Sequence, residues 1–154
     1  MSTRGEKAQQ LFLQGYNCAQ SIAVCFCDVL NLSPQLAAQI SGGYGGGIGR
    51  MREVCGSFCG LTMVLSVALG YADPADREGK KRLYALTQKA GDAFRAKNGF
   101  LRCRDLLGID AKAPLDPTPS ERTADYYRRR PCDEIVKSAA EILEQILIDE
   151  NILK

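Results

Sequence analysis

The residues whose chemistry stands out in this chain are seven cysteines, and histidine is absent. Without histidine there is no Ser–His or Cys–His catalytic pair, no histidine-ligated zinc and no C-x-x-C-H haem site. No two cysteines form a C-x-x-C motif, which excludes a thioredoxin-type motif and a paired zinc knuckle. No pair of carboxylates stands out from ordinary helix surfaces. The sequence therefore favours chemistry at sulfur: redox reactions, disulfide exchange or binding of a thiophilic metal.

Four cysteines are predicted to lie at or near the start of a helix, and these are Cys18, Cys55, Cys103 and Cys132. Unpaired backbone N–H groups at a helix start stabilise a thiolate, the form that attacks disulfides and binds metals. Arg50 and Arg52 precede Cys55, and their charges are expected to favour its thiolate further. Cys25 and Cys27 fall inside an apolar helix and are interpreted as small buried hydrophobic residues.

A glycine-rich segment lies just before Cys55, and six of the eight residues over 42–49 are glycine. Such a density predicts a loop, and the segment contains neither a P-loop motif nor G-x-G-x-x-G. One interpretation is a nest of backbone N–H groups that binds an anion. The favoured one is that the loop wraps closely around the start of the next helix and the sulfur of Cys55. Gly56 and Gly60 lie one turn apart on that helix, where they permit close approach of another backbone or a bulky group.

The remaining pattern is helical throughout and positions these residues. Apolar spacing predicts helices over about residues 4–15, 18–30, 54–72, 73–97 and 100–107, another from about 132 onward, and a short one at Ser33-Pro34. Residues 110–120 contain three prolines and are predicted to be a loop. No strand-like alternation, repeat or second domain is visible. We expect an all-α, bundle-like single domain over 1–154, with about five to seven helices around a buried central helix.

Composition limits the partners and the location. The net charge is +2, so a nucleic-acid-binding surface is not expected, and Arg128–Arg130 is interpreted as a solvated basic face. Val54–Ala72 has no charged residue, but its glycine, serine and threonine favour a buried helix over a membrane span. Residues 1–10 are polar and lack a signal-peptide core. The expected location is the cytoplasm, where cysteines more often serve metal or redox chemistry than structural disulfides.

Two motifs resemble the C_GCAxxG_C_C family of redox-active proteins: Gly45-Gly-Gly-Ile-Gly-Arg50 and Cys55-Gly-Ser-Phe-Cys-Gly60. Ser57 replaces the family alanine and Cys59 is an additional cysteine, while the other family cysteines match Cys18, Cys103 and Cys132. The resemblance implies a helical domain with a redox function. In some multihaem cytochromes a related domain accompanies an iron–sulfur centre, which implies ligation of a cluster by four cysteines. This chain has no haem motif, so haem is not expected.

Two functions remain open at this stage. In the first, Cys18, Cys55, Cys103 and Cys132 bind an iron–sulfur cluster, or alternatively zinc, for electron transfer or metal handling. Gly45, Gly46, Gly47, Arg50, Gly56 and Gly60 would then surround the cofactor. In the second, an oxidoreductase cycles between dithiol and disulfide, with Cys55 as nucleophile and Cys18, Cys59 or another thiol as the resolving thiol. A redox partner protein or a thiol substrate is expected in either case. A non-catalytic helical interaction domain is a further alternative, and the last helix could form a homodimer.

Overall fold

Helices make up 64% of the chain, and none of the described residues, 3–154, belongs to a strand. The computed structural model contains nine α-helices and one 3₁₀ turn over this range. They are α1 (Arg4–Leu13), α2 (Cys18–Cys25), α3 (Cys27–Leu30), α4 (Pro34–Ser41), η1 (Gly42–Tyr44), α5 (Gly56–Leu69), α6 (Arg77–Asn98), α7 (Cys103–Leu107), α8 (Ala124–Arg129) and α9 (Cys132–Asp149). Six of the helices have seven residues or more. The predicted all-α class is confirmed.

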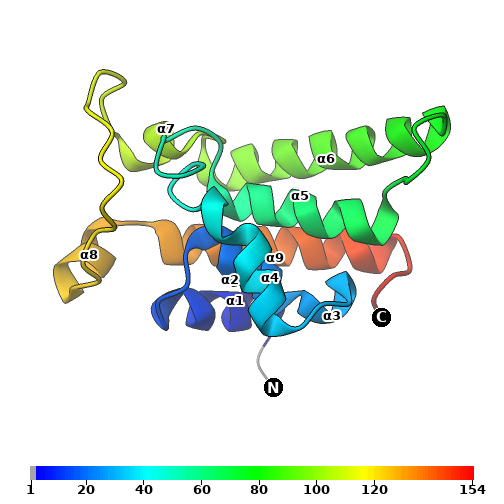
Figure 1. Ribbon diagram of the computed structural model, residues 1–154, viewed down its shortest axis with the longest axis horizontal. Helices are drawn as coiled ribbons and strands as arrows, with labels where there is room; N and C mark the ends of the chain where they lie inside the picture. The colour runs from blue at the N-terminus through cyan, green and yellow to red at the C-terminus, as the bar shows by residue number, and fades with distance from the viewer. Residues whose placement is uncertain (1–2) are drawn as a thin grey trace.

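The three longest helices, α5, α6 and α9, pack against one another and form one side of the bundle (Figure 1). Helix α1 packs along α9, and α2 lies between α1 and α5. The short helices α7 and α8 lie at one end of the molecule, joined by the long loop over 108–123. The starts of α7 and α9 lie at this same end, so the chain gathers several helix starts there (Figure 1).

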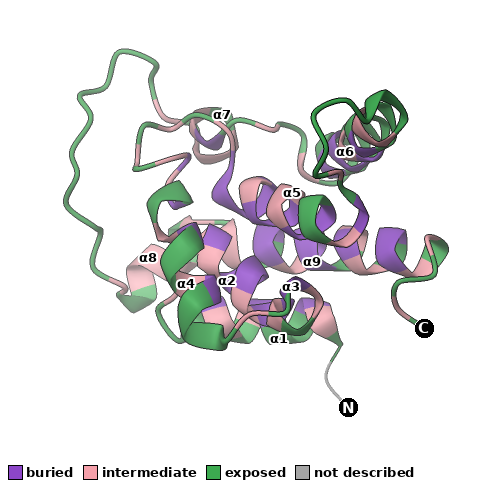
Figure 2. Cartoon of the chain, turned by 45° about the vertical axis from the view of Figure 1, so that its right-hand side comes forward, coloured by how far each residue is buried: buried purple, intermediate pink, exposed green. Residues whose placement is uncertain are grey.

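Helix α5 is the central helix that the sequence predicts, and α9 shares that position with it. Both are mostly buried or half-buried along their length (Figure 2). Leu61, Val64 and Leu65 of α5 are fully buried and belong to the single apolar core. The expectation that this helix is covered on every side is wrong in one place, because Val67 is 57% exposed. Its face toward the core is nonetheless rigidly held, which fixes the direction in which its first turn points.

The predicted helix over 18–30 is broken at Phe26, which separates α2 from α3. The reason is tertiary: Arg4 of α1 donates to the carbonyl of Cys25 at 3.0 Å, and its guanidinium stacks 4.7 Å from the buried Phe26 ring. Arg4 also forms two hydrogen bonds of 2.8 Å to the carboxylate of Asp28. One arginine thus takes up the backbone and side-chain groups at the break.

Two other boundaries differ from the prediction. Helix α6 begins at Arg77 rather than at Asp73-Pro74, because the side chain of Asp76 caps it by accepting from the amide of Gly79 at 2.9 Å. Helix α8 was not predicted, and it follows the Pro-rich loop with Thr123 as its cap. No helix of the described chain is both long and apolar enough to cross a membrane.

Candidate functional site

The four cysteines that the sequence places at helix starts line one small cavity. Cys18, Cys103 and Cys132 are the first residues of α2, α7 and α9, and Cys55 is the residue immediately before α5. The cavity has a volume of about 20 Å³, and its apolar walls are Leu106, Leu107 and Ile135. Helices that are distant in sequence therefore bring their first residues to one point, and the four thiols surround it.

A short stretch of antiparallel backbone holds Cys55 beside Cys103. Val54 and Arg102 form an isolated β-bridge, the only departure from helix and loop in the described chain. On one side of the bridge, the amide of Cys55 donates to the carbonyl of Leu101 at 2.9 Å. On the other side, the amide of Cys103 donates to the carbonyl of Glu53 at 2.6 Å. These two bonds fix the start of α7 against the start of α5.

Close packing between α2 and α5 places Cys18 beside Cys55. A Cβ atom on Gly56 would lie 2.7 Å from the carbonyl oxygen of Tyr44 and 3.3 Å from Sγ of Cys18. A Cβ atom on Gly60 would lie 2.8 Å from the carbonyl oxygen of Ala19 in α2. Gly56 is therefore needed because the carbonyl of Tyr44 in η1 lies against it, and Gly60 because α2 passes directly over it, in line with the close approach of another backbone that the sequence predicted.

The glycine loop makes an uncommon turn. Five consecutive residues, 46–50, have positive φ angles between 55° and 72°, and two of them, Ile48 and Arg50, are not glycine. Left-handed backbone costs a residue with a side chain about 1–2 kcal/mol, so the three glycines among these five residues make the turn possible. The chain is then crowded against the site, since a Cβ on Gly47 would lie 2.6 Å from Cβ of Cys103. The expectation that this loop wraps around a site cysteine holds, but the cysteine it contacts is Cys103.

The expected lowering of the pKa of Cys55 is wrong. Cys55 is only 6% exposed, and burial raises its pKa above the usual thiol range, assisted by the neighbouring Cys18. The nearby hydroxyl of Ser57, 3.0 Å from its sulfur, opposes this rise. Burial likewise raises the pKa of Cys132 to about 12. At both cysteines, the cost of removing a thiolate from water outweighs the stabilisation that the helix start gives to the thiolate.

Arg52, which was expected to favour a thiolate at Cys55, contacts Cys103 instead. Nη1 of Arg52 donates to Sγ of Cys103 at 3.6 Å, and burial still raises the pKa of that thiol although Arg52 opposes it. With no metal bound, the thiols of Cys55, Cys103 and Cys132 are therefore favoured in the protonated form.

The remaining cysteines lie outside the walls of this cavity. Cys59 is one turn beyond Cys55, and its thiol points to the carbonyl of Val54 at 3.8 Å. Burial raises its pKa to about 11, and Cys18 contributes to the rise. Cys25 is buried and donates to the carbonyl of Arg4 at 3.3 Å, as expected for a core cysteine, whereas Cys27 is only half-buried.

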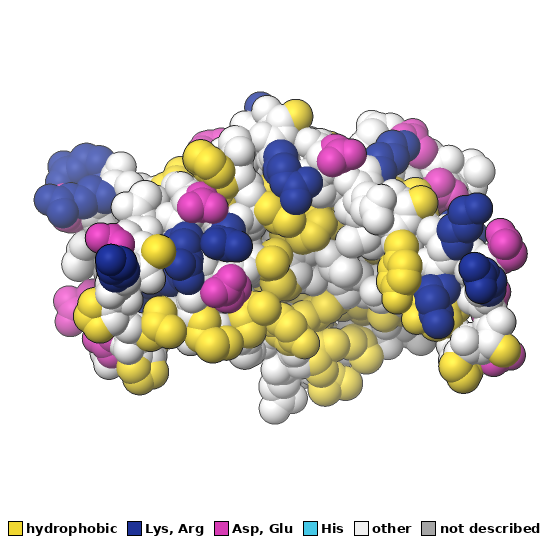
Figure 3. Space-filling view, turned by 90° about the horizontal axis from the view of Figure 1, so that it is seen from above, with side chains coloured by type: hydrophobic (Ala, Val, Ile, Leu, Met, Phe, Trp, Pro, Cys, Tyr) yellow, Lys and Arg dark blue, Asp and Glu magenta, His cyan; other side chains and the backbone are white. Residues whose placement is uncertain are grey.

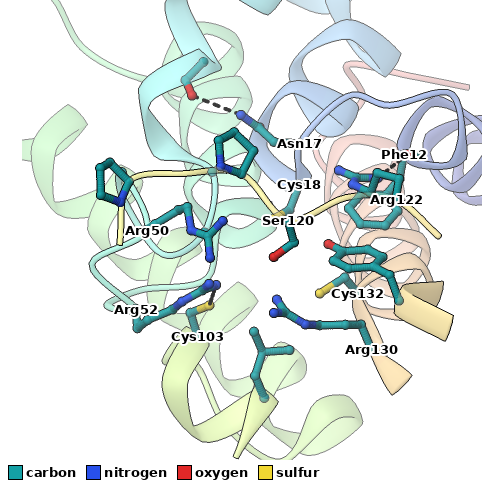
Figure 4. A pocket seen from close by; sticks show the side chains of 18 residues that line it. Phe12, Asn17, Cys18, Arg50, Arg52, Cys103, Ser120, Arg122, Arg130 and Cys132 are labelled. Atoms are coloured by element: carbon teal, nitrogen blue, oxygen red, sulfur yellow. Dashed lines mark hydrogen bonds between the residues drawn. The ribbon is translucent and has the colours of Figure 1, made fainter. Parts of the chain in front are cut away.

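A second, larger pocket of about 430 Å³ adjoins the cysteine cavity, and Cys18, Cys103 and Cys132 line both. Gly45, Gly46 and Arg50 of the glycine loop also line it. Figure 4 shows the guanidinium groups of Arg50, Arg52 and Arg130 directed toward its centre, with the cysteine sulfurs beside them.

Several lining residues were not singled out from the sequence: Asn17, Ser120, Arg122, Tyr126 and Arg130. Arg130 belongs to the run interpreted as a solvated face, which is correct for Arg128 and Arg129, both paired with Asp125. Arg130 instead faces the pocket, and its place two residues before Cys132 was the available signal. On the face in Figure 3, basic and acidic side chains are otherwise interspersed.

The four cavity thiols have the donor chemistry that a thiophilic metal requires. Four thiols with no competing histidine suit a thiophilic ion or an iron–sulfur cluster. Within residues 3–154, however, no three Cys, Asp or Glu side chains lie close enough together to hold a single ion as they stand. The space between the thiols admits about one water-sized group. The residues fit such a cofactor chemically, provided that their side chains rotate to meet it.

Among known protein families, the chain matches the model described as "Putative redox-active protein (C_GCAxxG_C_C)" over residues 16–146. This range contains all four cavity cysteines and the glycine loop. No curated protein and no solved structure matches the chain.

Proposed function

The chain belongs to the C_GCAxxG_C_C family of redox-active proteins, and we propose that its four family cysteines bind an iron–sulfur cluster or another thiophilic metal for electron transfer. The observation that carries the proposal is the convergence of Cys18, Cys55, Cys103 and Cys132 on one cavity. Buried thiols with raised pKa values gain little by ionising alone, whereas a bound metal cation makes the thiolate the stable form. A cluster would supply a one-electron redox centre.

The surroundings of the cavity suit such a centre. Leu106, Leu107 and Ile135 exclude water from one side, while three of the cysteines open onto the larger pocket. Arg52 beside Cys103 places positive charge next to a sulfur ligand, which favours the more reduced, more negative state of a cluster. Because the sulfurs in a [4Fe–4S] centre each bind a different iron, this cofactor tolerates wider ligand spacing than one ion does, but the cavity of about 20 Å³ would have to widen to admit it. A single thiophilic ion would need only the thiols to rotate, and the iron and zinc contents distinguish the two.

The test is the visible spectrum, iron content and sulfide content of protein purified without oxygen. Sulfur-to-iron charge-transfer bands are expected in the wild-type protein and in Cys27→Ser, a control cysteine outside the cavity. They should be lost in Cys103→Ser. Zinc without colour would change the metal but keep the site. A protein that contains neither iron nor zinc, or keeps its metal in Cys103→Ser, would overturn the proposal.

Thiol–disulfide exchange is the second candidate, and one observation favours it: Cys103 lies beside Arg52 and is reachable from the larger pocket. In this mechanism a thiolate attacks one sulfur of a substrate disulfide and releases the other as a thiol. A second cavity cysteine then attacks the mixed disulfide and completes reduction of the substrate. Cys55 and Cys103 are about equally buried, but only Cys103 lines the larger pocket, which favours Cys103 over Cys55 as the attacking group. Mass spectrometry of the trapped mixed disulfide would identify the nucleophile.

A further inference from the structure

Three arginines converge on the larger pocket without a carboxylate to neutralise them. Arg50, Arg52 and Arg130 all line it, and none forms an ion pair with any residue over 3–154. Asp110 and Asp116 line an adjoining pocket together with these arginines, but neither carboxylate forms an ion pair with them. Like charges held together in this way repel one another, and a bound anion would relieve that repulsion.

Arg50 also has a buried hydrogen-bond donor that lacks an acceptor. Nε of Arg50 is buried and has no hydrogen-bond partner among the described residues. Nη1 of the same residue donates to the carbonyl of Thr118, which ties the side chain to the Pro-rich loop. A buried donor left without a partner destabilises a fold, so an acceptor at this point would stabilise the protein. Arg50 is itself held in the strained left-handed turn of the glycine loop, which directs it here.

The size and walls of the pocket indicate an organic ligand rather than a simple ion. Its volume of about 430 Å³ falls within the range of small-molecule sites. Phe12, Leu107, Tyr126 and two prolines supply apolar walls. Arg122 is fixed as part of the wall, since it donates to the carbonyls of Phe12 at 2.9 Å and Tyr16 at 3.1 Å. The three remaining guanidinium groups point to the open centre (Figure 4).

We propose that this pocket binds a small organic anion that carries at least two carboxylate or phosphate groups, held by Arg50, Arg52 and Arg130. Guanidinium groups bind both kinds of oxyanion through paired hydrogen bonds. Because Arg52 also contacts Cys103, the bound molecule lies next to the cysteine cavity. The inference rests on the arginines and stands whether the cysteines bind a cluster, zinc or nothing.

The test is isothermal titration calorimetry on the full chain as purified, at constant ionic strength. The probes are tricarballylate, a tricarboxylate, and fructose 1,6-bisphosphate, and both bind metals weakly. Acetate serves as the singly charged control. Saturable binding of either probe supports the proposal, and the tighter one identifies carboxylate or phosphate as the preferred group. Failure of both to bind at millimolar concentration would overturn it.

Matched variants locate the binding. Arg130→Gln should weaken binding about tenfold to a hundredfold, the usual effect of losing a charge-assisted hydrogen bond. Arg129→Gln removes the same charge from an exposed residue that pairs with Asp125, and should leave binding unchanged. If Arg130→Gln does not fold, Arg52→Gln provides the same comparison. Equal weakening by Arg129→Gln would show a general charge effect and contradict the site.

Discussion

Substitution of Gly60 by alanine tests whether the contact between α2 and α5 builds the cysteine site. The new Cβ would lie 2.8 Å from the carbonyl oxygen of Ala19 and 2.9 Å from Cβ of Ile22. Both atoms are at or near the backbone of α2, so they cannot rotate away, and the two helices must separate. Overpacking of this kind costs about 1–3 kcal/mol. Alanine also raises helix propensity by about 1 kcal/mol, which leaves a net loss of about 1 kcal/mol.

Gly91→Ala in α6 is the matched control. Its Cβ would meet the Phe58 ring at 3.6 Å and Nη1 of Arg95 at 3.9 Å, both ordinary contact distances. The propensity gain is the same for both helices, so Gly91→Ala should be more stable than the wild-type protein by about 0.5–1 kcal/mol. The difference between the two variants then isolates the packing cost.

Urea unfolding followed by far-ultraviolet circular dichroism measures both free energies, with equal m-values as the check on a two-state transition. Gly60→Ala should also bind less metal per chain, because Cys18 moves with α2 away from Cys55. Equal stabilisation by the two alanines would refute this account of the motif. It would mean that α2 does not pass over Gly60 as closely as 2.8 Å.

Three other measurements follow from the structure. At pH 8, iodoacetamide should alkylate Cys25 about a hundredfold more slowly in folded than in urea-unfolded protein, because burial raises its pKa from 9.0 to about 11; equal rates by mass spectrometry would contradict this. Arg4 lowers the pKa of Asp28, so their interaction stabilises the fold above the unfolded pKa of about 3.9 and is lost as pH falls through the lower folded value. The wild-type protein should therefore lose stability between about pH 5 and pH 2 as the carboxylate of this pair is protonated. In Asp28→Asn that loss, measured by urea unfolding, should be smaller by less than about 1 kcal/mol, because Asp28 is largely exposed. An equal loss in both proteins would argue against the pair. Arg122→Met removes two hydrogen bonds that hold the segment before α8. Amide hydrogen exchange in α8 should therefore accelerate by at least about tenfold. Arg128→Met, the control, should leave the exchange rate unchanged.

Local signals in the sequence were sufficient for most of the fold. Asn17 caps α2 and Ser33 caps α4, each with a side chain that accepts from an amide three residues ahead, as a short polar residue at a helix start does in many proteins. Cys18 follows from the Asn17 cap and is confirmed as the first residue of a helix, as is Cys132 after Pro131, whereas the helix expected over about 100–107 begins only at Cys103. The break at Phe26 could not be predicted locally, because Arg4 causes it from another helix.

The sequence by itself determined most of the helices, the nearness of four cysteines to helix starts and the family, since these depend on neighbouring residues or on motifs read in order. Only the tertiary structure decided that the cysteines meet, that Arg52 pairs with Cys103 rather than Cys55, and that Arg130 faces the pocket instead of solvent. The physical reason is that burial and charge proximity depend on segments far apart in sequence, such as Phe12 and Arg122, which are 110 residues apart. The same reason explains why the expected thiolate at Cys55 was wrong: desolvation is a property of the packed molecule, and no local pattern in the sequence encodes it.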